Sequence, residues 1–166
     1  MKNEKGFSLI ELLIVVAIIG IIAAIAIPNL LKSRQAANEA SAIGSTRTIG
    51  TSQATYMSTR GKGKDFAVGF TELMADNAVD TALGSGNKSG FVFECVGVAA
   101  AAGVPSYFNT AASPQSTGNF GTGNRSFYSN ETFVVYQQDG KVAVGGWGTA
   151  PPPGTRLAAA PAVPIE

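Results

Sequence analysis

An apolar run near the N-terminus constrains this chain more than any other feature. From Leu12 to Ile27 every residue is apolar or glycine. Residues 7–31 hold only three strongly polar residues, Ser8, Glu11 and Asn29. A helix needs about 20 apolar residues to cross a bilayer, and this segment supplies 25. Because basic residues precede the run, the N-terminal end is expected to stay in the cytoplasm. The sequence therefore predicts a membrane-spanning helix whose C-terminal side lies outside.

Two ordinary interpretations compete for this run. A secretory signal peptide has an apolar stretch of ~7–15 residues that ends in a small-residue cleavage site. The present run is longer, and Pro28-Asn29-Leu30-Leu31 follows it. The other competitor is a plain single-pass anchor, which hydrophobicity alone favours.

Glu11 argues for more than an anchor. A charged side chain within a membrane helix costs about 2.5–3.5 kcal/mol on insertion scales and usually marks function. As an alternative, Glu11 lies only one turn from the helix start and could reach the headgroups. If the chain is cut between Gly6 and Phe7, the new α-amino group lies four residues from Glu11. That amine has a pKa near 8, so the two charges can neutralise each other within one chain or between neighbours.

The segment over residues 5–12 reads KGFSLIEL, which closely resembles the class III signal of type IV pilins and type II secretion pseudopilins. The resemblance runs from Gly6 to about Leu31 and does not reach the rest of the chain. It implies that a prepilin peptidase removes residues 1–6, cutting after Gly6, and N-methylates Phe7. It also implies that Glu11 pairs with the N-terminus of a neighbouring subunit during assembly.

Two residues that favour a break flank Ile21 to Ile27. Pro28 removes a backbone donor and Gly20 lowers helix propensity. In a lone membrane helix the result would be a mild kink compensated by neighbours. The resemblance implies local melting between Gly20 and Pro28 in an assembled pilus.

Residues 32–60 contain no proline and are predicted to continue the helix. Small or apolar residues recur at helical spacing on one face (Ala36, Ala40, Ile43, Gly50, Ala54 and Met57) and on a second face (Ala42, Ile49 and Tyr56). A helix over residues 7–60 would be about 80 Å long. Its first half has no partner in its own chain and must be covered by lipid or by other copies.

The segment from Gly61 to Lys64 should end the helix, and residues 61–150 should form a head. A short helix is expected at Thr71–Ala75 and a strand at Gly90–Val98, whose Phe91, Phe93 and Cys95 share one side. Residues 99–124 have the composition of a loop. Strands are expected at 125–128 and 132–138, with a turn at Ser129-Asn130. An Asp139-Gly140 hairpin then leads into residues 141–145.

The predicted fold is α+β: a long N-terminal helix, with a protruding apolar half, packed on an antiparallel meander of three or four strands, as in type IV pilins. The domain organisation is a leader (1–6), a membrane and filament-core helix half (7–31), an outer helix half (32–60), a head (61–150) and a Pro/Ala-rich tail (151–166). The tail is expected to be extended or disordered.

Composition excludes several classes of site. The chain has no histidine and one cysteine, Cys95, so a histidine general base and an intrachain disulfide are impossible. Cys95 is expected to be a buried small hydrophobe. A net charge of +1 provides no footprint for nucleic acid. Scattered carboxylates predict no metal or cofactor, and a membrane-tethered enzyme is disfavoured.

The resemblance implies a major pilin that polymerises into a type IV pilus used for adhesion, twitching motility or DNA uptake. A pseudopilin of a type II secretion system is the alternative. The implied partners are other copies of the chain, a prepilin peptidase and an inner-membrane assembly platform. The implied location is the inner membrane as a single-pass precursor, followed by the extracellular filament.

Overall fold

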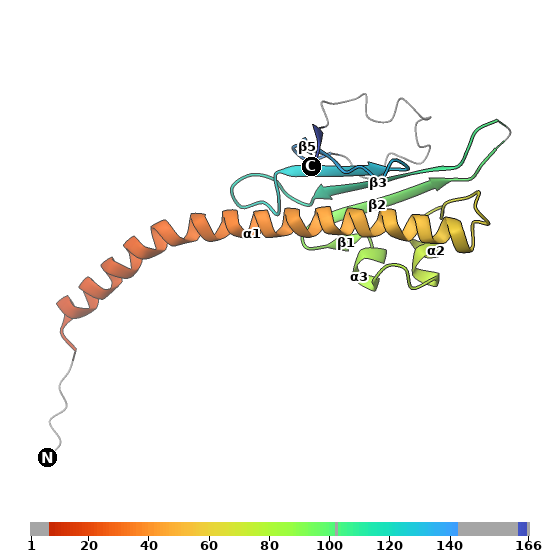
Figure 1. Cartoon of the computed structure of the whole chain (residues 1–166). Coiled ribbons are helices and arrows are strands. Elements are labelled where there is room, and N and C mark those ends of the chain that lie inside the picture. The colour runs from red at the N-terminus through yellow and green to blue at the C-terminus, as the bar shows by residue number, and fades with distance from the viewer. Residues whose placement is uncertain (1–6, 102, 143–162, 166) are drawn as a thin grey trace, which may run out of the picture.

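The computed structural model describes residues 7–101, 103–142 and 163–165. Its longest element is the helix α1 (Leu9–Thr59), of 51 residues. A small head packs on the C-terminal half of α1, and the N-terminal half curves away from it without other contacts (Figure 1). The helix ends at Arg60, because Lys62 and Gly63 take positive φ angles of 53° and 73°. The predicted stop at residues 61–64 is confirmed.

The head is built on one six-stranded antiparallel sheet in which consecutive strands are neighbours. The strands are β1 (Asn87–Lys88), β2 (Phe91–Val98), β3 (Tyr107–Pro114), β4 (Arg125–Asn130), β5 (Tyr136–Asp139) and β6 (Val163–Pro164). The predicted α+β class and meander topology are confirmed, while the predicted number of strands is too low. β6 supplies the extra edge strand from the end of the C-terminal tail.

Two short helices join α1 to the sheet. They are α2 (Phe70–Ala75), which contains the helix expected at 71–75, and α3 (Thr81–Gly84). Leu73 of α2 and Leu83 of α3 are buried against the core. This connection therefore closes one side of the head against α1 (Figure 1).

The strand β2 shows the alternation that the sequence predicts. Phe91, Phe93 and Cys95 are buried on the side that faces α1, and the residues between them are half-buried. The core combines these side chains with Ala42 and Ile49 of α1 and Phe127 of β4. The burial predicted for Cys95 is confirmed.

The prediction of a loop over residues 99–124 is wrong, because it contains β3. This strand pairs along its whole length with β2, from Phe91 opposite Pro114 to Val98 opposite Tyr107. All eight of its residues are buried. A central strand buried on both faces need not alternate, and its small residues Thr110 to Ser113 resemble loop composition.

The predicted ends of the last strands also need correction. Ser129 and Asn130 belong to β4, and β5 begins only at Tyr136. The predicted hairpin at Asp139-Gly140 is wrong, since β5 pairs with β4 and β6. The Val142 backbone N–H instead donates to the hydroxyls of Ser113 (3.1 Å) and Ser126 (3.3 Å). Residues 143–145 lie outside the described part of the chain.

Candidate membrane and assembly segment

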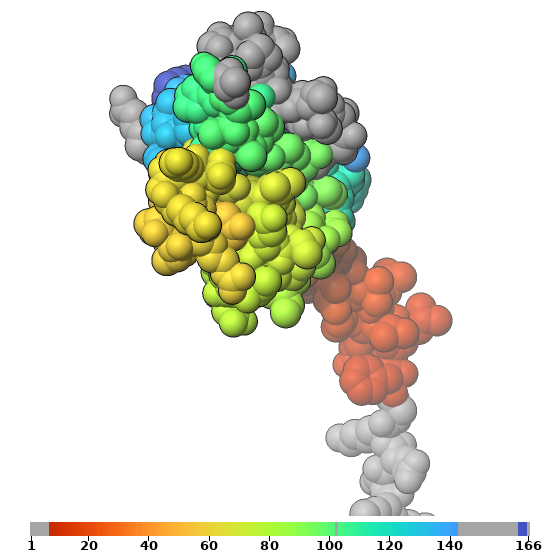
Figure 2. All heavy atoms as spheres, turned by 90° about the vertical axis from the view of Figure 1, so that its right-hand side faces the viewer, coloured from red at the N-terminus to blue at the C-terminus, as the bar shows by residue number. Residues whose placement is uncertain are grey.

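The N-terminal half of α1 exposes a continuous apolar surface. Its large apolar side chains are between 49% exposed, at Val15, and 88% exposed, at Phe7. The helix is long and apolar enough to cross a membrane, and none of its most apolar window is buried. Figure 2 shows these residues projecting beyond the head. A soluble monomer rarely exposes so large an apolar surface, so this half requires a covering.

The predicted assembly residues lie at the exposed start of this surface. Glu11 sits in the first turn of α1, and its Oε2 accepts a hydrogen bond of 2.9 Å from the Ser8 backbone N–H. An acidic side chain at this position also suits the positive end of the helix dipole. Phe7 precedes the helix, whereas Gly6 lies outside the described residues. The carboxylate is thus anchored within one turn of Phe7 and remains accessible to another chain.

The helix is continuous through Gly20 and Pro28 in the isolated chain. No heavy atom of the described chain approaches within 4 Å of a Cβ placed on Gly20. The curvature in Figure 1 lies in this half. Local melting between Gly20 and Pro28 therefore stays a prediction for the assembled state.

The C-terminal half of α1 buries a stripe that is mostly polar. Its positions follow the alternating steps of four and three of a helix face. The stripe comprises Gln35, Glu39, Ala42, Thr46, Ile49 and Gln53. The predicted face through Ala42 and Ile49 is therefore confirmed, but the face through Ala36, Ala40 and Ala54 is exposed. Counting apolar residues alone missed Gln35, Glu39 and Gln53.

Glu39 fixes α1 to the start of β4. Its Oε1 accepts the Asn124 backbone N–H at 2.7 Å, and its Oε2 accepts Nε and Nη2 of Arg125 at 2.8 and 2.7 Å. Arg125 also donates to Gln137 at 2.7 Å and lies over the Phe127 ring. The carboxylate is almost buried, so its charge is balanced by a bidentate guanidinium, the geometry that best suits such a pair.

Gln53 fixes the other end of the stripe. Its side-chain amide donates to the Ala67 carbonyl at 3.0 Å and accepts the Ala67 N–H at 2.8 Å. The same Nε2 lies 3.1 Å from Cys95 Sγ. Burial raises the pKa of the Cys95 thiol to about 12. The thiol is therefore protonated at neutral pH and is a structural group rather than a nucleophile.

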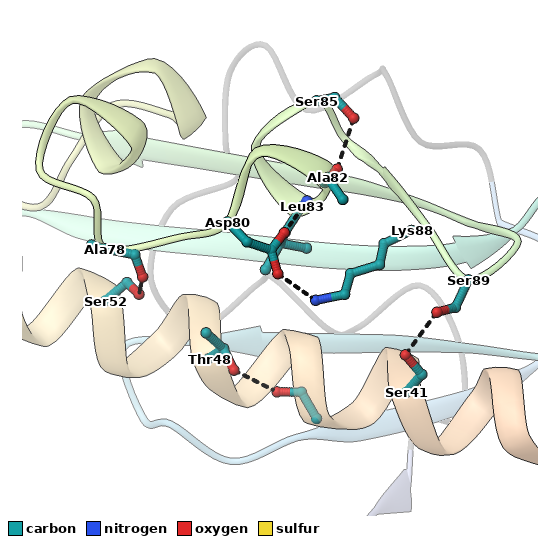
Figure 3. Close-up of polar contacts among 11 residues, drawn as sticks. Ser41, Thr48, Ser52, Ala78, Asp80, Ala82, Leu83, Ser85, Lys88 and Ser89 are labelled. Atoms are coloured by element: carbon teal, nitrogen blue, oxygen red, sulfur yellow. Dashed lines mark hydrogen bonds and ion pairs between the residues drawn. The ribbon is translucent and has the colours of Figure 1, made fainter.

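Hydroxyl contacts hold the α2–α3 connection and the start of the sheet on α1 (Figure 3). Ser52 donates to the Ala78 carbonyl at 2.6 Å, and the hydroxyls of Ser41 and Ser89 lie 2.9 Å apart. Asp80 caps α3 through the Leu83 N–H and pairs with Lys88 at 2.6 Å. The Lys88 hydrogen bond, with that of Leu83, holds the pKa of Asp80 below its ordinary value.

Metal and cofactor chemistry finds no support in the described segments. Within residues 7–101, 103–142 and 163–165 no group of three or more Cys, Asp or Glu side chains is placed to hold a metal ion. The polar side chains of the buried stripe are used to dock α1. The unusual surface of the described chain is the apolar half of α1.

Comparison with known proteins addresses that half first. Residues 1–27 match the family model of the prokaryotic N-terminal methylation motif. No solved structure matches the chain.

Three curated relatives extend beyond the motif. The type IV major pilin protein PilA of Myxococcus xanthus is 38% identical over 89 residues, which cover 54% of this chain and 36% of the relative. The type IV major fimbrial protein FimA of Dichelobacter nodosus is 47% identical over 75 residues, 43% of this chain and 46% of the relative. The type IV wide pilus major component PilA4 of Thermus thermophilus is 67% identical over 39 residues, 24% of this chain and 30% of the relative. The chain thus matches less than half the length of each.

The motif and these relatives agree with the described fold, in which a long apolar helix packs on an antiparallel sheet. The exposed half of α1 lies within the matched region, and the sheet supplies the head that such a helix carries. On this evidence the chain belongs to the type IV pilin family.

Proposed function

We propose that this chain is the structural major subunit of an extracellular type IV pilus. The observation that carries the proposal is the uncovered apolar half of α1, which ends in Phe7 and Glu11. Before assembly a bilayer covers this half, and in the filament the same half of neighbouring copies replaces the lipid. Use in adhesion, motility or DNA uptake follows from the filament and not from a catalytic site.

The relatives favour a pilus over the pseudopilus of a secretion system. The three described above are named as major components of pili or fimbriae. Long filaments on sheared cells would support the pilus, and a product confined to the periplasm would contradict it. The relatives are structural proteins, which agrees with a chain that performs no catalysis.

Maturation is proposed to begin with removal of residues 1–6 by a prepilin peptidase, which then methylates the Phe7 amine. Gly6→Ala should leave the leader attached, because the added methyl group sits at the cleaved bond. Gly20→Ala is the matched control, since its Cβ meets no heavy atom within 4 Å. Intact-mass and N-terminal analysis of sheared filaments gives the readout. Gly6→Ala chains that start at Phe7 would refute the assignment.

Assembly is proposed to use the charge of Glu11, which pairs with the Phe7 amine of a neighbouring copy. The neighbouring copies are brought together at an inner-membrane assembly platform. Glu11 also caps its own helix through Ser8, so two variants are needed. Glu11→Ala removes the cap and the charge, while Glu11→Gln keeps an acceptor for the Ser8 N–H and removes only the charge. Both variants should insert in the membrane and yield few filaments. Normal filament yield from Glu11→Gln would show that capping suffices and would contradict charge pairing.

In the filament, α1 is proposed to melt locally between Gly20 and Pro28. Pro28 lacks the N–H that would bond one turn back, so this segment is the weakest part of the apolar half. Pro28→Ala should make filaments harder to extend when single filaments are pulled. Equal extension of both filaments under the same force would refute this role.

A further inference from the structure

The loop between β3 and β4, residues 115–124, lies beside α1 at the level where the apolar run ends (Figure 1). A groove of about 500 Å³ separates them. It is lined from the helix by Ile27, Pro28, Leu31 and Lys32, and from the loop by Asn119 and Phe120. We call residues 115–124 the Phe120 loop.

Phe120 is held out in the open by an anchored backbone. The Gln35 amide donates to the carbonyls of Gly118 at 2.6 Å and Gly121 at 3.1 Å, and Asn38 donates to Thr122 at 3.0 Å. The Phe120 side chain is nevertheless 84% exposed. By contrast, Phe91, Phe93 and Phe127 of the sheet are buried. The loop therefore presents a large aromatic ring that its own chain does not cover.

The level of the groove coincides with the expected edge of the bilayer. About 20 residues of helix cross the hydrocarbon region, and 20 residues counted from Phe7 end at Ala26. Ile27 and Pro28 of the groove come directly after. Aromatic side chains are favoured at this depth of a membrane.

The charges at this level suit phosphate groups. Lys32 and Arg34 are exposed and follow the apolar run, and residues 115–124 contain no acidic residue. Glu39, one turn further along, is balanced by Arg125. Basic residues next to a membrane helix are attracted to anionic lipid by about 1 kcal/mol each.

We propose that the Phe120 loop seats the unassembled subunit on the outer surface of the membrane. Phe120 and the groove take up the apolar upper part of a phospholipid, while Lys32 and Arg34 contact its phosphate. This inference rests on the membrane-anchored precursor of the proposed function. Seating fixes the height of the head above the bilayer before a filament forms.

The test places single tryptophans on the full chain in vesicles of phosphatidylethanolamine and phosphatidylglycerol. The native tryptophan, Trp147, is first replaced by phenylalanine. Phe120→Trp reports on the loop, and Val104→Trp, 44% exposed between β2 and β3 at the far end of the head, is the control. Headgroup nitroxide lipids should quench tryptophan at 120 several-fold more strongly than at 104. Equal quenching of an inserted chain would overturn the inference alone.

Two further outcomes are informative. Shielding of tryptophan at 120 only in sheared filaments would overturn the membrane seat and indicate a second copy in the groove. A chain that carbonate extracts from the vesicles would contradict both the seat and the membrane-anchored precursor. Lys32→Gln with Arg34→Gln should reduce the quenching at 120 in phosphatidylglycerol vesicles and leave it unchanged in phosphatidylcholine vesicles. Unchanged quenching in both would overturn the phosphate contact.

Discussion

The two halves of α1 reverse the usual distribution of polar and apolar residues. The N-terminal half is almost wholly apolar and exposed, whereas the buried stripe of the C-terminal half contains Gln35, Glu39 and Gln53. Each of these polar side chains is matched by partners on the head. The contrast shows that the apolar half is built for a covering from outside the chain, and the other half for one defined position on the sheet.

Ile49 and Ile19 give the largest expected contrast between the halves. Ile49→Ala removes a side chain that is 0% exposed in the core, and should lower the free energy of unfolding of the head by about 2–5 kcal/mol. Ile19→Ala, with its side chain 58% exposed, should leave that free energy unchanged. Urea unfolding in detergent compares the two. Equal losses would mean that the apolar half contributes to the folded head.

Glu39 and Glu11 give the next contrast. Glu39→Ala leaves Arg125 and the Asn124 N–H without their acceptor, which should cost about 1–3 kcal/mol of head stability. Arg125 is itself partly exposed, so solvent reduces the penalty. Glu11→Ala should cost the head nothing while reducing filament yield. A stable head in Glu39→Ala would show that the ion pair does not fix α1.

Gln53 and Thr48 compare the buried stripe with the exposed face of the same half of α1. Gln53→Ala should lower the free energy of unfolding by about 1–3 kcal/mol, because both Ala67 hydrogen bonds are lost. Thr48→Ala is the control, since its exposed hydroxyl bonds only within α1. Chemical denaturation should separate the two variants clearly. Similar stabilities would contradict the role of Gln53 in docking.

Cys95 provides the smallest effect, which depends on pH. Burial raises its pKa from 9.0 to about 12, so the folded chain holds the proton more tightly than the unfolded chain. Stability from this group is full below pH 9.0 and falls as the pH rises toward about 12. Cys95→Ala should remove that part of the pH dependence. An unchanged slope would assign it to other groups.

The apolar helix, its stop near Gly61 and the alternation of β2 could be predicted because each is a local pattern. The strand β3 could not, since burial on both faces removes alternation and its small residues look like a loop. The polar members of the α1 stripe were also missed. Their partners, Asn124, Arg125 and Ala67, are distant in sequence, so nothing local shows that a glutamine or glutamate is buried.

The central claim is that the head and the outer half of α1 fold without the apolar half. Urea unfolding of a chain that begins at Asn29, followed by circular dichroism, tests it most directly. The account predicts a soluble chain with helical signal and one cooperative transition, since the core of the head contains no residue before Ala42. Aggregation, or a gradual loss of signal without a transition, would contradict it.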